Sequence, residues 1–256
     1  MTDLSAAQEE LLAQVPIPHG AQIEGAPITY GHDGTELEGY VAHDAAANEP
    51  RPGILVVHDW LGVGPTVEMR AQMLARLGYV AFAADIYGAD TRPTHETAPA
   101  LTRQYYGDLP LMRARVQAAY DTLVELPQVD ETRIAVIGYC FGGSAAIEFA
   151  RTGADIKGVV SFHGRLITHD PSDADAIRAK LLILTGGSDP VVTDENLHDF
   201  QDELRAVPDL DWQTVVYSGA PHAFTVPGQN YRPLADARSW RAQLDFFDEI
   251  FAEASA

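Results

Sequence analysis

The stretch Gly138-Tyr139-Cys140-Phe141-Gly142-Gly143 decides the fold, because it joins an expected buried strand directly to an expected helix. The residues before it, Arg133-Ile134-Ala135-Val136-Ile137, are mostly apolar and rich in β-branched side chains, which predicts a strand. The residues after it, Ser144-Ala145-Ala146-Ile147-Glu148-Phe149-Ala150, are good helix formers. A strand that ends in Gly-x-Cys-x-Gly-Gly and turns at once into a helix is typical of a nucleophile elbow.

The glycines of this turn have a steric reason. A nucleophile on a sharp strand-to-helix turn brings its neighbours against the strand and the helix, and Gly138 and Gly142 have no side chains to collide. The turn places the sulfur of Cys140 at a helix N-terminus, where partial positive charge favours the thiolate. The alternative is an inert, buried cysteine in an ordinary turn. Glycines on both sides of the sole cysteine favour the nucleophile.

A cysteine nucleophile needs a base and a group that orients the base. Asp189 lies in Thr185-Gly186-Gly187-Ser188-Asp189-Pro190, just past one predicted core strand. His222 lies in Ser218-Gly219-Ala220-Pro221-His222-Ala223-Phe224, past the last predicted strand. Taken singly, each could be an ordinary residue: Asp189 a turn aspartate before proline, and His222 one histidine among nine. Together they follow the hydrolase order of nucleophile, acid and histidine, which predicts a catalytic triad of Cys140, Asp189 and His222.

A third loop, Val57-His58-Asp59-Trp60-Leu61-Gly62, also follows a predicted core strand. Such folds place an oxyanion donor there, so the backbone N–H groups of Trp60 and Phe141 are the expected oxyanion hole. Asp59 has two possible roles. Its carboxylate could hold the thiol of Cys140 protonated until substrate arrives, or it could stabilise its own loop through backbone hydrogen bonds.

Composition limits the classes of partner. The chain has 256 residues, a formal net charge of −20 and only two lysines, which argues against nucleic acid and anionic membrane surfaces. One cysteine excludes an internal disulfide and a metal cluster built on cysteines. The N-terminus has no basic segment followed by an apolar one, and no long apolar run occurs elsewhere, so the expected location is the cytoplasm.

The order of the expected elements predicts an α/β-hydrolase fold, with a mostly parallel sheet of about eight strands, helices on both faces and an N-terminal antiparallel hairpin. A single domain is expected over 1–256, with a helical extension over 1–20. A helix is expected near 4–15, and the segment 91–108 is expected to be irregular. The hairpin is expected at 23–30 and 37–42, further strands at 53–57, 80–83, 158–161, 181–184 and 212–217, and further helices at 66–77, 111–126 and 234–251.

Five motifs together resemble the dienelactone hydrolase (carboxymethylenebutenolidase) family over nearly the whole chain from Ile23 onward. They are the cysteine elbow, His58-Asp59-Trp60-Leu61-Gly62, Asp85-Ile86-Tyr87, Ser188-Asp189-Pro190 and Pro221-His222-Ala223-Phe224. The resemblance implies that an enol-lactone is hydrolysed through a thioester-like acyl-enzyme. It also implies a catalytic triad of a cysteine, an aspartate and a histidine, which in this chain are Cys140, Asp189 and His222. Tyr87, His163 and Phe224 are candidates for lining the pocket, and His58 is expected to be structural.

The sequence departs from the family pattern at three positions. The family has a glutamate that contacts the resting thiol, and this chain has Asp59 there. Two arginines bind the dienelactone carboxylate in the family, and Ala89 and Val226 stand at the matching positions. Four other arginines are possible substitutes: Arg92, Arg103, Arg165 and Arg232.

The resulting prediction is a cofactor-free cysteine hydrolase of a small activated ester or lactone, as a monomer or small homo-oligomer that holds no metal. An alternative of another class is a scaffold that binds a small ligand, or senses oxidants through Cys140, without turnover. A sensor needs only the thiol, whereas a hydrolase needs Cys140 and His222 together. Proteolysis is a third alternative, and it would need an extended groove.

Overall fold

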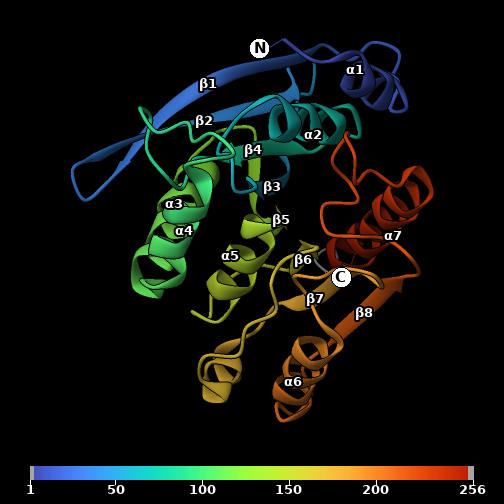
Figure 1. Ribbon diagram of the computed structural model, residues 1–256. Helices are drawn as coiled ribbons and strands as arrows, with labels where there is room; N and C mark the ends of the chain where they lie inside the picture. The colour runs from blue at the N-terminus through green and yellow to red at the C-terminus, as the bar shows by residue number, and fades with distance from the viewer. Residues whose placement is uncertain (1–2, 253–256) are drawn as a thin grey trace. The chain divides into compact units, whose positions relative to one another are not determined.

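A computed structural model of the protein describes residues 3–252, which alternate between strands and helices along most of the chain (Figure 1). The chain divides into two compact units between Ile134 and Ala135. This division falls inside strand β5 (Val129–Tyr139), which begins in the first unit and ends in the second. The expected single domain over 1–256 stays a prediction.

The first unit begins its sheet with a long antiparallel hairpin, drawn in blue in Figure 1. Strand β1 (Ile23–His32) pairs along its whole length with β2 (Thr35–Asp44). The two residues between the strands, Asp33 and Gly34, have positive φ values of 47° and 74°. Left-handed backbone at both positions is the type I′ geometry, which matches the twist of the strands and is suited to Asp-Gly. The predicted hairpin is confirmed.

Two parallel strands complete the sheet of the first unit. Strand β3 (Arg51–Val57) pairs with β4 (Val80–Ala84), and β4 pairs antiparallel with β2. The order within this unit is therefore β1-β2-β4-β3. Helix α2 (Pro65–Arg76) connects β3 to β4 and is buried from Val67 to Ala75, and helix α4 (Leu109–Val124) packs on β1 and β3.

The predicted N-terminal helix is confirmed as α1 (Ala6–Ala13). A capping box between Ser5 and Gln8 stabilises the start of this helix.

The expectation that 91–108 is irregular was wrong, because helix α3 (Ala98–Tyr106) occupies much of it. Pro99 lies in the first turn of α3, where the missing N–H of proline removes no helical hydrogen bond. Tyr105 buries its ring and donates its hydroxyl to the carbonyl of Ile86 at 2.8 Å. Tertiary packing thus stabilises a helix that the local run of Pro and Thr concealed.

The second unit repeats the strand-helix pattern, and its strand order is β5-β6-β7-β8 with all neighbours parallel. Apolar residues dominate the two inner strands: every residue of β6 is buried, and so is every residue of β7 after Lys180. Because a parallel sheet with covering helices hides both faces, its strands need no polar alternation. The elements after β5 are α5 (Phe141–Ala150), β6 (Gly158–Phe162), the short 3₁₀ helix η1 (Pro171–Ala176), β7 (Lys180–Gly186), α6 (Asp194–Arg205), β8 (Trp212–Tyr217) and α7 (Pro233–Ala252).

The predicted fold class is confirmed. The described residues contain eight strands, mostly parallel, with an antiparallel hairpin at the N-terminal end and helices in the connections from one parallel strand to the next. Within residues 3–252, no helix has both the length and the apolar character that crossing a membrane requires. In the second unit, β5, β7 and β8 each lead into a loop that carries one residue of the predicted triad. Ligands of parallel sheets bind at this end of the strands.

Candidate active site

Cys140 stands on a strained turn between β5 and α5. Its φ of 54° and ψ of −114° are unusual for a residue with a side chain. A Cβ on Gly138 would lie 2.0 Å from the carbonyl oxygen of Gly142, so only glycine fits at position 138. Gly138 therefore has the steric cause that the elbow interpretation gave it.

Backbone hydrogen bonds hold this turn in place. The N–H of Cys140 donates to the carbonyl of Phe162 at 2.9 Å, at the end of β6. The N–H groups of Gly143 and Ser144 donate to the Cys140 carbonyl at 3.0 and 3.3 Å, which starts α5. Cys140 is half-buried and sits at the N-cap of α5, where the helix dipole favours a negative charge on its sulfur.

The structure brings the side chains of Cys140, His222 and Asp189 together. The Nε2 atom of His222 lies 3.0 Å from the Sγ of Cys140, and its Nδ1 atom lies 2.9 Å from Oδ2 of Asp189. Asp189 cannot donate when ionised, so Nδ1 carries the proton of this contact and Nε2 faces the sulfur. The arrangement suits proton transfer between the thiol and Nε2.

Asp189 is fixed from its other side. Its Oδ1 accepts the N–H groups of Val191 and Val192 at 2.8 and 3.3 Å, and its side chain is fully buried. The loop after β7 and the loop after β8 touch through Gly186, because a Cβ there would lie 2.3 Å from the carbonyl oxygen of Ala220. A glycine at the end of β7 thus allows the close approach of the loops that carry Asp189 and His222.

The electrostatics of His222 favour its charged form. Burial of the ring lowers its pKa, but the hydrogen bonds and negative charges of Asp189 and Cys140 outweigh burial and raise the pKa of His222 to about 10. An imidazolium beside the sulfur favours the thiolate for the same reason.

Two of the predicted pocket residues, His163 and Phe224, lie next to His222. The ring centroids of His163 and His222 are 5.3 Å apart in an edge-to-face arrangement, and His163 makes a similar contact with Phe224 at 5.3 Å. Both His163 and Phe224 are fully buried. The Nε2 atom of His163 lies 2.8 Å from Oγ1 of Thr225, a residue that sequence reasoning missed because nothing in a lone threonine marks it.

Of the other predicted site residues, Asp59, Trp60 and Tyr87 lie in the first unit, and Phe141 begins α5 in the second. Asp59 accepts the N–H of Leu61 through Oδ1 at 2.8 Å, a contact that its loop-stabilising alternative predicts. The hydroxyl of Tyr87 donates to the carbonyl of Trp60 at 3.3 Å, which ties the loops after β3 and β4 together. The prediction that Asp59 modulates the thiol and the prediction that Trp60 is an oxyanion donor stay predictions.

His58 is structural, as expected. Its ring is fully buried, and Nε2 accepts the N–H of Ile86 at 3.1 Å. Its Nδ1 therefore carries the proton and donates to the carbonyl of Asp59 at 2.6 Å. Burial is the main reason that the pKa of His58 is lowered, which keeps the ring neutral.

Two of the four possible substitute arginines are turned toward the protein itself. Arg92 donates to the carbonyls of Gly88 and Thr91 at 2.9 and 3.1 Å and pairs with Glu38 at 3.6 Å. Arg232 donates to the carbonyls of Gln229 and Tyr231 at 3.3 and 3.0 Å. Arg103 and Arg165 lie on α3 and in the loop after β6.

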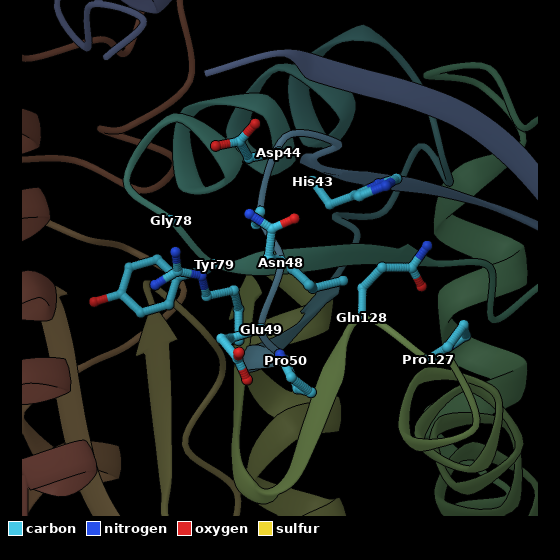
Figure 2. A pocket seen from close by; sticks show the side chains of 12 residues that line it. His43, Asp44, Asn48, Glu49, Pro50, Gly78, Tyr79, Pro127 and Gln128 are labelled. Atoms are coloured by element: carbon cyan, nitrogen blue, oxygen red, sulfur yellow. The ribbon is translucent and has the colours of Figure 1, made fainter. Parts of the chain in front are cut away.

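The first unit also contains a pocket of about 170 Å³ at the N-terminal ends of β3 and β4 (Figure 2). None of the predicted site residues lines it. Because the carboxyl ends of parallel strands are where ligands gather, this pocket is not the candidate active site. Its lining is mostly polar and includes His43, Asp44, Asn48, Glu49, Arg51, Tyr79 and Gln128.

Comparison with known proteins identifies the family of this chain. The model of the dienelactone hydrolase family matches residues 37–251. A Yersinia pestis protein named "putative carboxymethylenebutenolidase" is 27% identical over 90% of this chain and 91% of its own. The crystal structure of a dienelactone hydrolase-like promiscuous phosphotriesterase from metagenomic libraries is 36% identical, with a TM-score of 0.85 over 90% of this chain and 99% of its own.

A further solved structure shares the fold. A Klebsiella pneumoniae protein described as a "putative dienelactone hydrolase" superposes with a TM-score of 0.80, over 89% of this chain and 99% of that protein, at 22% identity. The family model covers well over half of the chain, and the structural matches extend over nearly all of it. The chain therefore belongs to the dienelactone hydrolase family, within the α/β-hydrolase superfamily, and is a hydrolase of that type.

Proposed function

We propose that the protein hydrolyses small, uncharged, activated esters or lactones through an acyl-enzyme on Cys140. The observation that carries the proposal is the continuous chain of contacts from Sγ of Cys140 to His222 and from His222 to Asp189, at 3.0 and 2.9 Å. Each of the three groups has the chemistry that its place requires: a nucleophile, a proton carrier and a buried carboxylate that orients the carrier.

In the proposed first half-reaction, the thiolate of Cys140 attacks the carbonyl carbon of the substrate and forms a sulfur–carbon bond. The carbonyl electrons move to the oxygen, which becomes an oxyanion. When the tetrahedral intermediate collapses, the bond to the leaving oxygen breaks and that oxygen takes the proton of the His222 imidazolium. The products are a thioester on Cys140 and an alcohol, enol or phenol, or for a lactone the ring-opened chain.

In the second half-reaction, neutral His222 accepts a proton from water while the water oxygen attacks the thioester. Collapse breaks the sulfur–carbon bond, releases the carboxylic acid and restores the thiolate beside the imidazolium. Asp189 holds Nδ1 throughout, so Nε2 serves both steps. The N–H of Phe141, at the start of α5, is the proposed oxyanion donor of this unit, because helix N-termini stabilise negative charge.

The proposed preference for uncharged substrates rests on three observations. Ala89 and Val226 replace the arginines that bind a substrate carboxylate in the family that this chain resembles. Arg92 is tied to Glu38 and to backbone carbonyls, so it is not available as a replacement. A chain of net charge −20 also repels anions at long range.

Phosphotriester hydrolysis is a second candidate. It is favoured by the 36% identity with the promiscuous phosphotriesterase over nearly the whole of both chains. A thiolate that attacks phosphorus would expel an aryloxide and leave a phosphoryl group on sulfur, which water would then have to remove.

A substrate panel tests the proposed function. Wild-type protein and Cys140→Ala are assayed on an aryl acetate, a neutral enol-lactone, the matched lactone with a free carboxylate and a diethyl aryl phosphate. We expect wild-type turnover of the neutral ester and lactone and its loss in Cys140→Ala. Retained turnover in Cys140→Ala would overturn the mechanism, and no turnover of any ester or lactone would overturn the proposed function.

A further inference from the structure

The loop that carries His222 is anchored on a histidine that takes no part in the proposed chemistry. Phe224 and Thr225 follow His222 closely, and both are fully buried. Thr225 directs its Oγ1 at Nε2 of His163, 2.8 Å away. The same imidazole packs edge-on against His222 and against Phe224, with ring centroids 5.3 Å apart in each case. One buried side chain therefore contacts the catalytic-base candidate and two residues of the turn behind it.

His163 has an unusual backbone conformation. It directly follows β6 and has a φ of 43°, a left-handed conformation that is costly for a residue with a side chain. Its N–H donates to the carbonyl of Leu184 at 2.8 Å, so it is held to β7, the strand that leads to Asp189. The preceding residue, Phe162, accepts the N–H of Cys140 at 2.9 Å. His163 thus lies on a rigid support shared with the nucleophile and the orienting carboxylate.

The turn after His222 needs such a support. Ala223 has a φ of 59°, again left-handed, and its carbonyl accepts the N–H of Val226 at 3.0 Å. A strained four-residue turn that begins beside the base can shift the ring when it relaxes. Asp189 fixes only the Nδ1 side of His222, and an edge-to-face contact has a preferred angle, so the ring of His163 opposes tilting of His222.

We propose that His163 and Thr225 form a positioning pair that holds the ring of His222 in the orientation in which Nε2 faces Cys140. The proposed role of the pair is to position His222, not to take part in the chemistry. It acts by locking the turn 223–226 through the bond between Oγ1 of Thr225 and Nε2 of His163. A buried imidazole that only filled space would cost more than a phenyl ring of similar shape, because a polar ring needs a hydrogen-bond partner inside a protein. This inference rests on the proposed role of His222 as partner of the Cys140 thiolate.

Alkylation of Cys140 by iodoacetamide reads this orientation without any substrate. Only the thiolate reacts, and the chain has no other cysteine, so the rate near pH 7 reports the pairing of the sulfur with His222. The variants are Thr225→Val, which removes the hydroxyl at nearly constant shape, and Thr225→Ser, which keeps it. His163→Phe keeps a ring against His222 and removes the nitrogen. The double variant combines His163→Phe with Thr225→Val, and thermal unfolding checks that each protein folds.

We expect Thr225→Val and His163→Phe each to lower the alkylation rate at pH 7 by about 10-fold or more, since small misplacements of a reacting group have effects of this size. Thr225→Ser should stay within about twofold of wild type, and the double variant should be no slower than the slower single variant, as expected for two groups that act as a unit. At high pH, where Cys140 is ionised in every variant, the differences in alkylation rate should vanish. If Thr225→Val does not fold, the comparison of His163→Phe with wild type decides.

Two results would overturn the positioning pair. One is a wild-type alkylation rate in both His163→Phe and Thr225→Val. The other is a rate in Thr225→Ser as low as in Thr225→Val, which would assign the effect to the methyl group of Thr225. The proposed function fails separately. If no ester or lactone is hydrolysed but the alkylation rates follow the expected pattern, the pair stands and the hydrolase chemistry does not.

Discussion

Nε2 of His222 lies 3.0 Å from Sγ of Cys140, which gives the sole cysteine of the chain a proton partner at hydrogen-bonding distance. This contact is made by loops that are separated by 82 positions in the sequence. A redox sensor would need an accessible, acidic thiol but no base that can return a proton to a leaving group. The contact therefore favours hydrolysis over redox sensing.

Replacing His222 by alanine should leave the fold intact and lower kcat/KM on an aryl ester by about 10²–10⁴, because thiolate formation and leaving-group protonation lose their partner. The matched control is His198→Ala on α6, whose side chain is 68% exposed and pairs with Asp202 on the same helix. That variant should hydrolyse the ester at the wild-type rate. Near-normal turnover in His222→Ala would mean that the base lies elsewhere.

The charge state of the pair gives a second prediction. The pKa of His222 is raised to about 10, so the ring stays protonated through neutral pH. We expect this positive charge to favour the thiolate of Cys140. Thiolate absorbance near 240 nm, with Cys140→Ser as the blank, should already be present at pH 7. In His222→Ala it should appear only at higher pH, because the sulfur has lost its positively charged neighbour. Equal titration curves in the two proteins would contradict the ion pair.

Substrate charge gives a third prediction. A neutral ester should be hydrolysed at least as well as the matched free acid, because no arginine stands at Ala89 or Val226 and the chain carries a net charge of −20. Added salt should narrow the difference, since it screens the long-range repulsion. Measuring kcat/KM for an acid and its methyl ester across salt concentrations checks this. A strong preference for the acid at every salt concentration would mean that an arginine such as Arg103 or Arg165 serves the site.

The structure also predicts one large stability effect away from the triad. Arg151 on α5 is buried and pairs with Glu148 at 2.5 Å and with Glu203 on α6 at 2.7 Å. Replacing Arg151 by methionine leaves two buried carboxylates without their cation, which should lower the free energy of unfolding by about 3–5 kcal/mol. Urea denaturation measures the change. The control is Arg241→Met, whose exposed pair with Asp245 should matter little. Similar stability of Arg151→Met and wild type would contradict this account of the cluster.

Much of the fold and of the triad could be predicted because each rests on local chemistry. Gly138 is forced by a backbone contact within the elbow, so its spacing from Cys140 is visible in the sequence. The turn Asp33-Gly34 has left-handed backbone at both positions, a conformation that Asp-Gly favours. Asp189 and His222 follow predicted strands, and parallel strands bring their carboxyl ends to one edge.

The remaining features depend on contacts that no local pattern records. Thr225 is one threonine among many until the fold sets its hydroxyl 2.8 Å from His163. Helix α3 was missed because the segment 91–108 is rich in Pro and Thr, although Pro99 lies in the first turn of the helix, where proline is tolerated. Arg92 was a reasonable substitute for the missing arginines, and only the structure shows that backbone carbonyls and Glu38 occupy its guanidinium.

The most direct test of the central claim is the mass of the intact protein, quenched in acid during turnover of an activated aryl ester. The account predicts that part of the protein gains one acyl group, that the peptide containing Cys140 carries it, and that hydroxylamine removes it as expected for a thioester. Cys140→Ala should gain no mass and hydrolyse no ester. Hydrolysis that persists in Cys140→Ala, or an acyl group on any other residue during turnover, would contradict the claim that Cys140 is the nucleophile.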